Sequence, residues 1–236
     1  MLETEGIVLR HVRYKESSLI LDILTEKLGF RSFIMNSVFK KGNQRLASVL
    51  QLMNIVELVC YYHENKTIHR IKEVRPSVLY QSIPYDIKRA AIGGFILELL
   101  RKTVKDLQTQ DELYSFVRSS YLQLDESALP DPNFHISFMI QFTRYLGIMP
   151  TMDHDPLIKN SFDIQNGQFV LYNEQNQYHL RPDISSDLAL LMNGQSIGID
   201  SIKRKQLLDS MILYYRMHID NFGEMKTQEI YKTVLH

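Results

Sequence analysis

Five apolar runs of strand length follow one another along the first eighty residues. The runs are rich in β-branched and aliphatic residues, which favour strands. They cover residues 6–14, 18–25, 30–35, 52–63 and 66–79. Between the third and fourth runs, Leu46, Val49 and Leu50 follow the i, i+3, i+4 spacing of a helix. The pattern therefore predicts three strands, a short helix over residues 43–51, and two further strands.

This order of elements is typical of the OB-fold, a small Greek-key barrel that commonly binds single-stranded nucleic acid. Glu64 and Asn65 separate the last two runs and suit a tight hairpin, because Asn tolerates a positive φ. After Pro76 the apolar period changes to 3.6, which indicates helices. The chain is predicted to belong to the α+β class, with an OB-fold domain at residues 1–80 and a mainly helical domain at residues 81–236.

The helical half contains one segment of a different character. Long helices are expected over residues 84–106, 109–124, 133–146 and from about 200 to 221, with a short one over 185–192. Gly93-Gly94 inside the first of them indicates close packing against another helix. Residues 151–184 lack this period, and Asn166-Gly167 lies between two strand-like pieces. A small β-hairpin insertion is expected there, held by four apolar side chains: Phe162, Ile164, Phe169 and Leu171.

Charge is balanced overall but unevenly placed. The chain carries 27 Lys and Arg against 27 Asp and Glu; residues 1–80 hold 12 against 8, and the remainder 15 against 19. The segment Phe39–Arg45 contains three cations and a glycine between two strand-like runs. Such a loop can present cations and backbone amides to a polyanion, although a solvated basic connection has the same composition. In the last predicted strand Lys66, Arg70 and Lys72 share one face.

Aromatic residues are interleaved with these cations. Tyr14, Phe30, Phe33 and Phe39 could stack on nucleic-acid bases, and the alternative for most of them is a place in the core. The single cysteine, Cys60, lies in an apolar run and is expected to be a buried thiol. The N-terminus lacks the features of a signal peptide, and no apolar run approaches the ~20 residues that span a bilayer. An intracellular, soluble protein is therefore expected.

Little in the sequence indicates catalysis. The chain lacks the P-loop, the GxGxxG fingerprint, the GxSxG elbow and the HExxH motif. The segment Asp153-His154-Asp155, with His179, offers possible metal ligands, but adjacent residues rarely bind one ion together. Asp125 and Glu126 lie at a predicted helix end and are expected to be solvated. The isolated histidines His11, His69 and His135 are expected to be packed or surface residues.

A series of short segments is distributed along nearly the whole chain: Gly6–Arg10, Lys15–Ser18, Leu24-Thr25, Gly29, Phe39–Gly42, Gln51–Glu57, Leu97–Leu100, Leu146–Pro150 and Tyr214–His218. In their order and spacing, these segments resemble the RecO family of bacterial recombination mediators. Many members carry a four-cysteine zinc module after the Leu-Gly-x-x-Pro turn. Residues 151–184 contain no cysteine. We therefore expect no zinc, and the structural role of that module is left open.

The resemblance implies an N-terminal OB-fold, a C-terminal helical domain and no enzymatic activity or cofactor. It implies binding of single- and double-stranded DNA, annealing of complementary strands, and action with RecR on strands coated by single-stranded DNA-binding protein, whose C-terminal tail is a partner, so that RecA can load. A cytoplasmic, nucleoid-associated protein is expected. The family pattern places DNA contacts on the basic OB-fold positions: Arg10, Arg13, Lys15, Arg31, Lys40, Lys41 and Arg45, with Lys66, Arg70 and Lys72 as further candidates.

Two other classes of function compete with this one. An adaptor would use the barrel as an inert scaffold and hold an acidic partner tail in its helical half, without direct DNA contact. A metal-dependent hydrolase would use Asp153, His154 and His179. Charge reversal at Lys40, Lys41 and Arg45 separates the mediator from the adaptor, and metal analysis tests the hydrolase.

Overall fold

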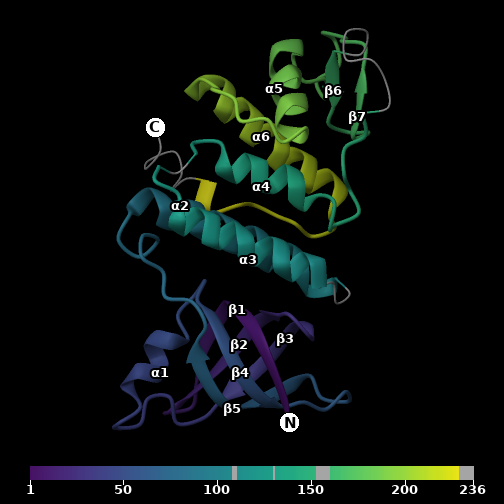
Figure 1. Ribbon diagram of the computed structural model, residues 1–236. Helices are drawn as coiled ribbons and strands as arrows, with labels where there is room; N and C mark the ends of the chain where they lie inside the picture. Colours follow the sequence, from purple (N-terminus) through teal and green to yellow (C-terminus); the bar gives the residue numbers. More distant parts are fainter. Residues whose placement is uncertain (108–110, 130, 153–159, 229–236) are drawn as a thin grey trace. The chain divides into compact units, whose positions relative to one another are not determined.

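The computed structural model describes residues 1–107, 111–129, 131–152 and 160–228, apart from the side chains of Gln44 and Asp106. The chain divides into two compact units, Met1–Ala128 and Leu129–His236, and Figure 1 shows their helices and strands. Within the described ranges, no helix is long and apolar enough to cross a membrane.

The first unit begins with a closed five-stranded barrel (Figure 1). Its strands are β1 (Leu2–Tyr14), β2 (Ser18–Thr25), β3 (Gly29–Met35), β4 (Ile55–Tyr61) and β5 (Ile68–Pro76), and α1 (Gln44–Val49) joins β3 to β4. The strand order is β1-β2-β3-β5-β4, with β3 and β5 parallel. The predicted OB-type barrel and α+β class are confirmed. Strand β1 begins four residues earlier than predicted because its first residues pair with β4, as Leu2 does with Cys60.

Alternation along the strands fills the barrel with apolar side chains. The core contains Val8, Leu19, Leu21, Ile23, Leu28, Phe33, Met35, Val38, Leu50, Val56, Leu58, Cys60 and Ile71. The Cys60 thiol is buried, as predicted, and burial raises its pKa. Register shifts by one residue between Val8 and Arg10 on β1. This bulge lets Val8 contribute to the core while Arg10 reaches the surface.

Helical segments follow the barrel within the first unit: two α-helices and a short 3₁₀ helix, labelled η1, among the described residues. Asp86 caps α2 (Ile87–Thr103) by accepting hydrogen bonds from the first-turn amides, and η1 (Val104–Asp106) and α3 (Asp111–Glu126) follow. A Cβ at Gly93 would lie 3.6 Å from the Tyr121 ring of α3, so the predicted close helix contact is confirmed there; at Gly94 the space is open. Ile87 is 71% exposed because it lies in the first turn of α2.

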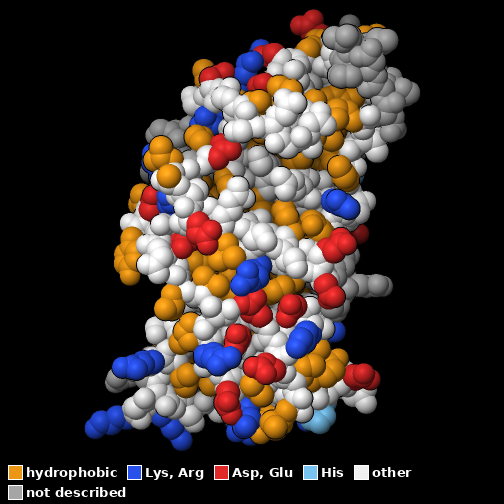
Figure 2. All heavy atoms as spheres, in the orientation of Figure 1, with side chains coloured by type: hydrophobic (Ala, Val, Ile, Leu, Met, Phe, Trp, Pro, Cys, Tyr) orange, Lys and Arg blue, Asp and Glu red, His pale blue; other side chains and the backbone are white. Residues whose placement is uncertain are grey.

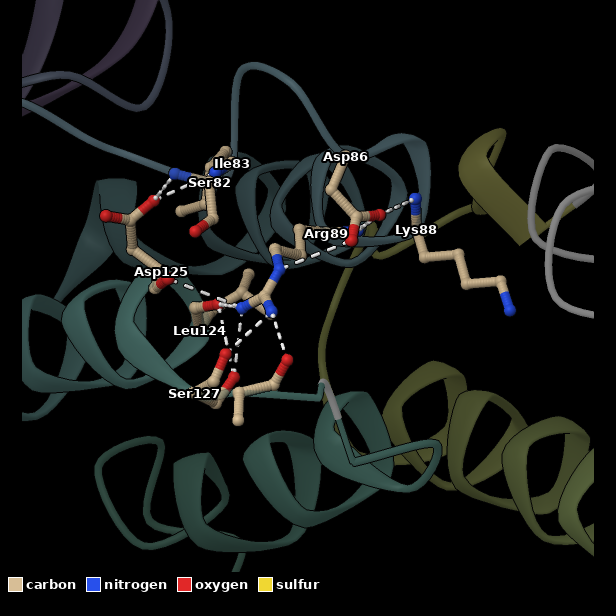
Figure 3. A network of polar contacts seen from close by, with 9 residues as sticks. Ser82, Ile83, Asp86, Lys88, Arg89, Leu124, Asp125 and Ser127 are labelled. Atoms are coloured by element: carbon tan, nitrogen blue, oxygen red, sulfur yellow. Dashed lines mark hydrogen bonds and ion pairs between the residues drawn. The ribbon is translucent and has the colours of Figure 1, made fainter.

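A buried polar network joins α2 to the end of α3 and to the segment before α2 (Figure 3). The Asp125 carboxylate accepts hydrogen bonds from the amides of Gln81, Ser82 and Ile83, each at 2.8 Å. The Arg89 guanidinium donates to the Leu124 carbonyl at 2.5 Å and to further acceptors at residues 125–128. The prediction that Asp125 is solvated is wrong, since these three amides need an acceptor inside the protein. Glu126 is exposed, as predicted.

The described residues of the second unit form three helices and a short hairpin. Its elements are α4 (Phe134–Phe142), β6 (Ser161–Asp163), β7 (Gln168–Val170), α5 (Pro182–Met192) and α6 (Ser201–His218). Asp200 caps α6 by accepting hydrogen bonds from the amides of Ile202 and Lys203. Helix α4 ends four residues before the predicted Leu146, because residues after Phe142 form turns that lead to Gly147 at φ +72°.

The predicted hairpin at Asn166-Gly167 is confirmed. The Asp163 carboxylate binds the amides of Gln165 and Asn166, and Gly167 adopts φ +67°. A Cβ at Gly167 would lie 2.8 Å from the Tyr214 hydroxyl of α6, so this glycine is required by both φ and space.

Three of the four predicted apolar anchors of this hairpin, Phe162, Ile164 and Phe169, are buried. Leu171 is 70% exposed, so its predicted anchoring role is wrong: β7 ends at Val170 before Leu171 can pair. The predicted domain boundary after residue 80 lies just beyond β5, whereas α2 and α3 share a compact unit with the barrel. A separately folding domain at residues 1–80 stays a prediction.

Candidate nucleic-acid interface

Two loops at one end of the barrel lie side by side. The Ser18 hydroxyl donates to the Asn36 side-chain carbonyl at 3.1 Å, and the Phe39 amide donates to the Ser17 carbonyl at 3.3 Å. The Asn43 side chain closes the second loop by donating to the Ser37 carbonyl at 2.9 Å. We call residues 13–18 together with residues 36–45 the cationic loop pair.

The cationic loop pair accounts for the whole excess of positive over negative charge in residues 1–80. It contains five cations, Arg13, Lys15, Lys40, Lys41 and Arg45, against a single carboxylate, Glu16. The rest of residues 1–80 has seven cations and seven carboxylates. All five cations are exposed. Figure 2 shows Lys and Arg side chains protruding beside the position of α1, whereas the neighbouring face mixes both signs.

Contacts within the loop pair orient some of these cations and leave others to solvent. The Arg13 guanidinium lies 5.0 Å from the centre of the Phe39 ring and donates to the Glu16 carbonyl. Lys15 adopts φ +55°, with its ammonium 5.4 Å from the Tyr14 ring. Within the described part of the chain, the ammonium groups of Lys40 and Lys41 have no hydrogen-bond acceptor and extend from a loop that turns at Gly42, where φ is +98°. Such cations can neutralise phosphates without first breaking an internal ion pair.

Arg10 and Arg31, two strand cations proposed from the sequence as DNA contacts, each bind an acceptor within the protein. Arg10 donates to the Asp22 carboxylate at 2.6 Å, and the same carboxylate accepts from the Ser32 hydroxyl at 2.7 Å. Arg31 is partly buried and donates to the Phe30 carbonyl at 2.7 Å. The structure thus brings Arg13, Lys15, Lys40, Lys41 and Arg45 together and places Arg10 and Arg31 outside that group.

The cations that follow Arg70 on β5 are paired with carboxylates. Arg70 is exposed, and Lys66 lies in the turn before the strand. Lys72 contacts the Glu73 carboxylate at 2.8 Å, and this hydrogen bond and charge raise the pKa of Lys72. Both line a 440 Å³ pocket whose rim also carries Glu3 and the Arg75–Glu57 ion pair. The β5 end of the barrel therefore has carboxylates beside its cations, unlike the cationic loop pair.

One buried residue near these cations had no distinctive signal in the sequence. The His69 ring lies inside the barrel, 4.9 Å from the Tyr62 ring and 5.8 Å from the Phe33 ring. Among the described residues, neither ring nitrogen has a hydrogen-bond partner. Burial lowers the pKa of His69, and the nearby charges of Arg31, His63 and Lys66 lower it further. The histidine is therefore held neutral among cations.

This predicts a pH-dependent stability. A histidine whose folded pKa lies below its unfolded value contributes full stability above the unfolded pKa of about 6.5 and loses it as the pH falls. We expect the thermal midpoint of the native chain to fall more steeply between pH 7 and pH 5.5 than that of His69→Phe. Exposed His63→Gln removes only one of the neighbouring charges and leaves the buried His69 ring in place, so it should keep most of the native slope. Equal slopes for all three chains would contradict the assignment.

Of the possible metal ligands, the structure describes His179. His179 accepts a hydrogen bond from the Asn173 amide at 3.1 Å and lies 4.0 Å from the Asp163 carboxylate, whose oxygens also bind the hairpin turn. Residues 153–155 lie outside the described residues. Within the described ranges, no group of three His, Cys, Asp or Glu side chains could hold a metal ion.

Comparison with known proteins agrees with the fold. The family model for the N-terminal region of recombination protein O matches residues 1–80, and the model for the C-terminal region matches residues 84–227. Curated proteins named DNA repair protein RecO are similar over almost the whole chain. The protein of Bacteroides fragilis is 29% identical, covering 98% of this chain and 97% of its own length. That of Flavobacterium psychrophilum is 28% identical, covering 99% and 98%. The chain belongs to the RecO family of DNA repair proteins.

Proposed function

We propose that this chain is a mediator of recombinational DNA repair that binds single- and double-stranded DNA through the cationic loop pair. The observation that carries the proposal is the concentration of five exposed cations and one carboxylate in two adjoining loops. Cations that contact phosphates release condensed counterions, which gives affinity without sequence preference. Arg10, Arg31, Lys66, Arg70 and Lys72 are secondary contacts in this proposal.

Membership of the family supports the remaining steps of the proposal. The bound strands are annealed to complementary strands, and together with RecR the protein helps RecA to load on strands coated by single-stranded DNA-binding protein. The C-terminal tail of that coating protein is a proposed partner. The proposal contains no catalytic step or cofactor, and it places the protein in the cytoplasm on the nucleoid, where its DNA substrate lies.

Annealing is the activity that tests the proposal. The chain should accelerate the pairing of complementary fluorophore- and quencher-labelled oligonucleotides by about tenfold or more in EDTA, because neutralised phosphates let two strands approach. Lys40→Gln/Lys41→Gln should lose most of this acceleration. Lys88→Gln/Lys105→Gln removes the same charge from exposed positions outside the loop pair and should retain it. An annealing rate equal to that without protein would overturn the proposal.

The adaptor function has one structural observation in its favour. A 540 Å³ groove in the first unit is lined only by uncharged residues, including Leu52, Val78 and Tyr85. Leu79 and Tyr85 of this lining are prominently exposed. A groove of this composition suits an apolar protein segment better than an acidic tail. Retained partner binding in a variant that has lost DNA binding would favour the adaptor.

A further inference from the structure

Five residues, one on each strand, lie in register across the outer surface of the barrel. Val12 pairs with Ile20, Ile20 with Ile34, Ile34 with Arg70, and Arg70 with Tyr61. We call these five residues the outer row. Each is exposed or half-buried. The water-facing side of an antiparallel sheet normally carries polar residues. Three adjacent aliphatic side chains there indicate a surface that binds another molecule.

Three exposed aromatic rings, one of them in the outer row, each have a cation next to them. Tyr14, Phe39 and Tyr61 are 40%, 42% and 41% exposed, whereas Phe33, also a candidate for stacking, lies in the core. Lys15 lies over the Tyr14 ring and Arg13 over the Phe39 ring. Arg70 is the cross-strand neighbour of Tyr61. Exposed rings beside cations are the combination that binds single-stranded nucleic acid, since bases stack on rings and phosphates meet the charges.

The charges around the outer row favour a polyanion over an apolar protein segment. Arg10 lies in the next row of the sheet, paired with Asp22, and Asp22 pairs in turn with Ser32. The Asp22 carboxylate is nearly buried and already accepts from both neighbours, so it presents little negative charge to a ligand. Arg70 is exposed within the row itself. An acidic strand with apolar bases is complementary to this face.

We propose that unpaired bases stack on the outer row and on the rings of Tyr14 and Phe39 while the phosphates of the same strand contact the cationic loop pair. This inference rests on the proposed function and adds to it a preference for single strands, carried by these residues. The row crosses four strand spacings, about 19 Å, which suits several nucleotides. A duplex can contact the loops with its phosphates, but its bases are paired and cannot stack on the outer row. The outer row therefore adds no affinity for a duplex.

The test compares two matched triple variants. Ile20→Thr/Ile34→Thr/Tyr61→Ser removes apolar surface from the row, and Leu79→Thr/Ile87→Thr/Tyr85→Ser removes the same types of side chain from exposed positions outside the barrel. Anisotropy of a labelled oligothymidine, at fixed salt, should show the row variant binding about 10-fold or more weakly, since each stacked base contributes about 5- to 150-fold. The control should bind like the native chain. Affinity for a duplex of equal length should change less than twofold in both.

Two further measurements keep the proposal falsifiable. An abasic oligonucleotide has phosphates without bases and should bind the native chain and the row variant equally. If the row variant fails to fold, Tyr61→Trp offers a larger ring and should strengthen oligothymidine binding severalfold, with no change for duplex. If the row variant loses affinity for single strands and duplex alike, or for neither, the stacking role of the outer row is overturned, but the proposed function is not. No loss for either DNA would point to a protein that binds this face. A native chain that binds neither DNA overturns the proposed function as well.

Discussion

Charge reversal at the cationic loop pair is expected to abolish most DNA binding. Lys40→Glu/Lys41→Glu/Arg45→Glu should lower the affinity for a single-stranded oligonucleotide on the order of 100-fold at ~50 mM salt. Three phosphate contacts are lost and three carboxylates are placed near the strand. The three side chains are exposed, so the barrel should remain folded. Anisotropy titrations at two salt concentrations measure the loss.

The control for this prediction carries the same change of charge at another place. Lys88→Glu/Arg101→Glu/Lys105→Glu reverses three exposed cations of α2 and η1. Its affinity should remain within a few-fold of the native value if contact, rather than net charge, determines binding. Equal losses in the two variants would show that general electrostatics, and not the loop pair, holds the DNA.

The largest effect on stability is expected at Asp125. Asp125→Ala leaves the amides of Gln81, Ser82 and Ile83 without their acceptor, and it removes a negative charge near the buried Arg89 guanidinium. Loss of a buried charged acceptor of this kind costs about 3–5 kcal/mol of unfolding free energy. Urea denaturation of the native chain and the variant, read by circular dichroism, measures the difference.

Glu126→Ala is the matched control, since this neighbouring carboxylate is exposed; it should change stability by less than about 0.5 kcal/mol. Burial acts to raise the pKa of Asp125, but the hydrogen bonds from the three amides outweigh it and lower the pKa. A carboxylate with a lowered folded pKa stabilises the protein above its unfolded pKa and loses this contribution as the pH falls through the folded value. Asp125→Ala should therefore also reduce the acid sensitivity of unfolding, and an unchanged midpoint would contradict the role given to the network.

The barrel could be predicted from the sequence because its signals are local. Period-two alternation, turn residues and the short i, i+3, i+4 helix each depend on neighbours within a few positions. The predictions that are wrong depend on structure beyond these local signals. Asp125 resembles any helix-end carboxylate until residues 81–83 are seen to direct their amides at it, 42 to 44 positions away. Leu171 fits an alternating strand, but β7 stops before it.

The candidate interface was predictable in composition but not in arrangement. The basic segment Phe39–Arg45 is visible as a sequence, yet nothing in it indicates that the Phe39 amide bonds to Ser17 and brings Arg13 and Lys15 alongside. The sequence also could not separate Lys40, with no acceptor among the described side chains, from Arg10, which is paired with Asp22. The outer row is detectable only through cross-strand register, which the closed barrel determines.

The most direct test of DNA binding by the cationic loop pair is a salt series. The affinity of the native chain for a labelled single-stranded oligonucleotide should fall linearly on a log–log plot. The slope should be about −3 to −4 if four to six phosphates are neutralised, and Lys40→Glu/Lys41→Glu/Arg45→Glu should flatten it by about 2. A native slope near zero, no binding at the lowest salt, or a slope unchanged by the charge reversal would contradict the placement of DNA on these loops.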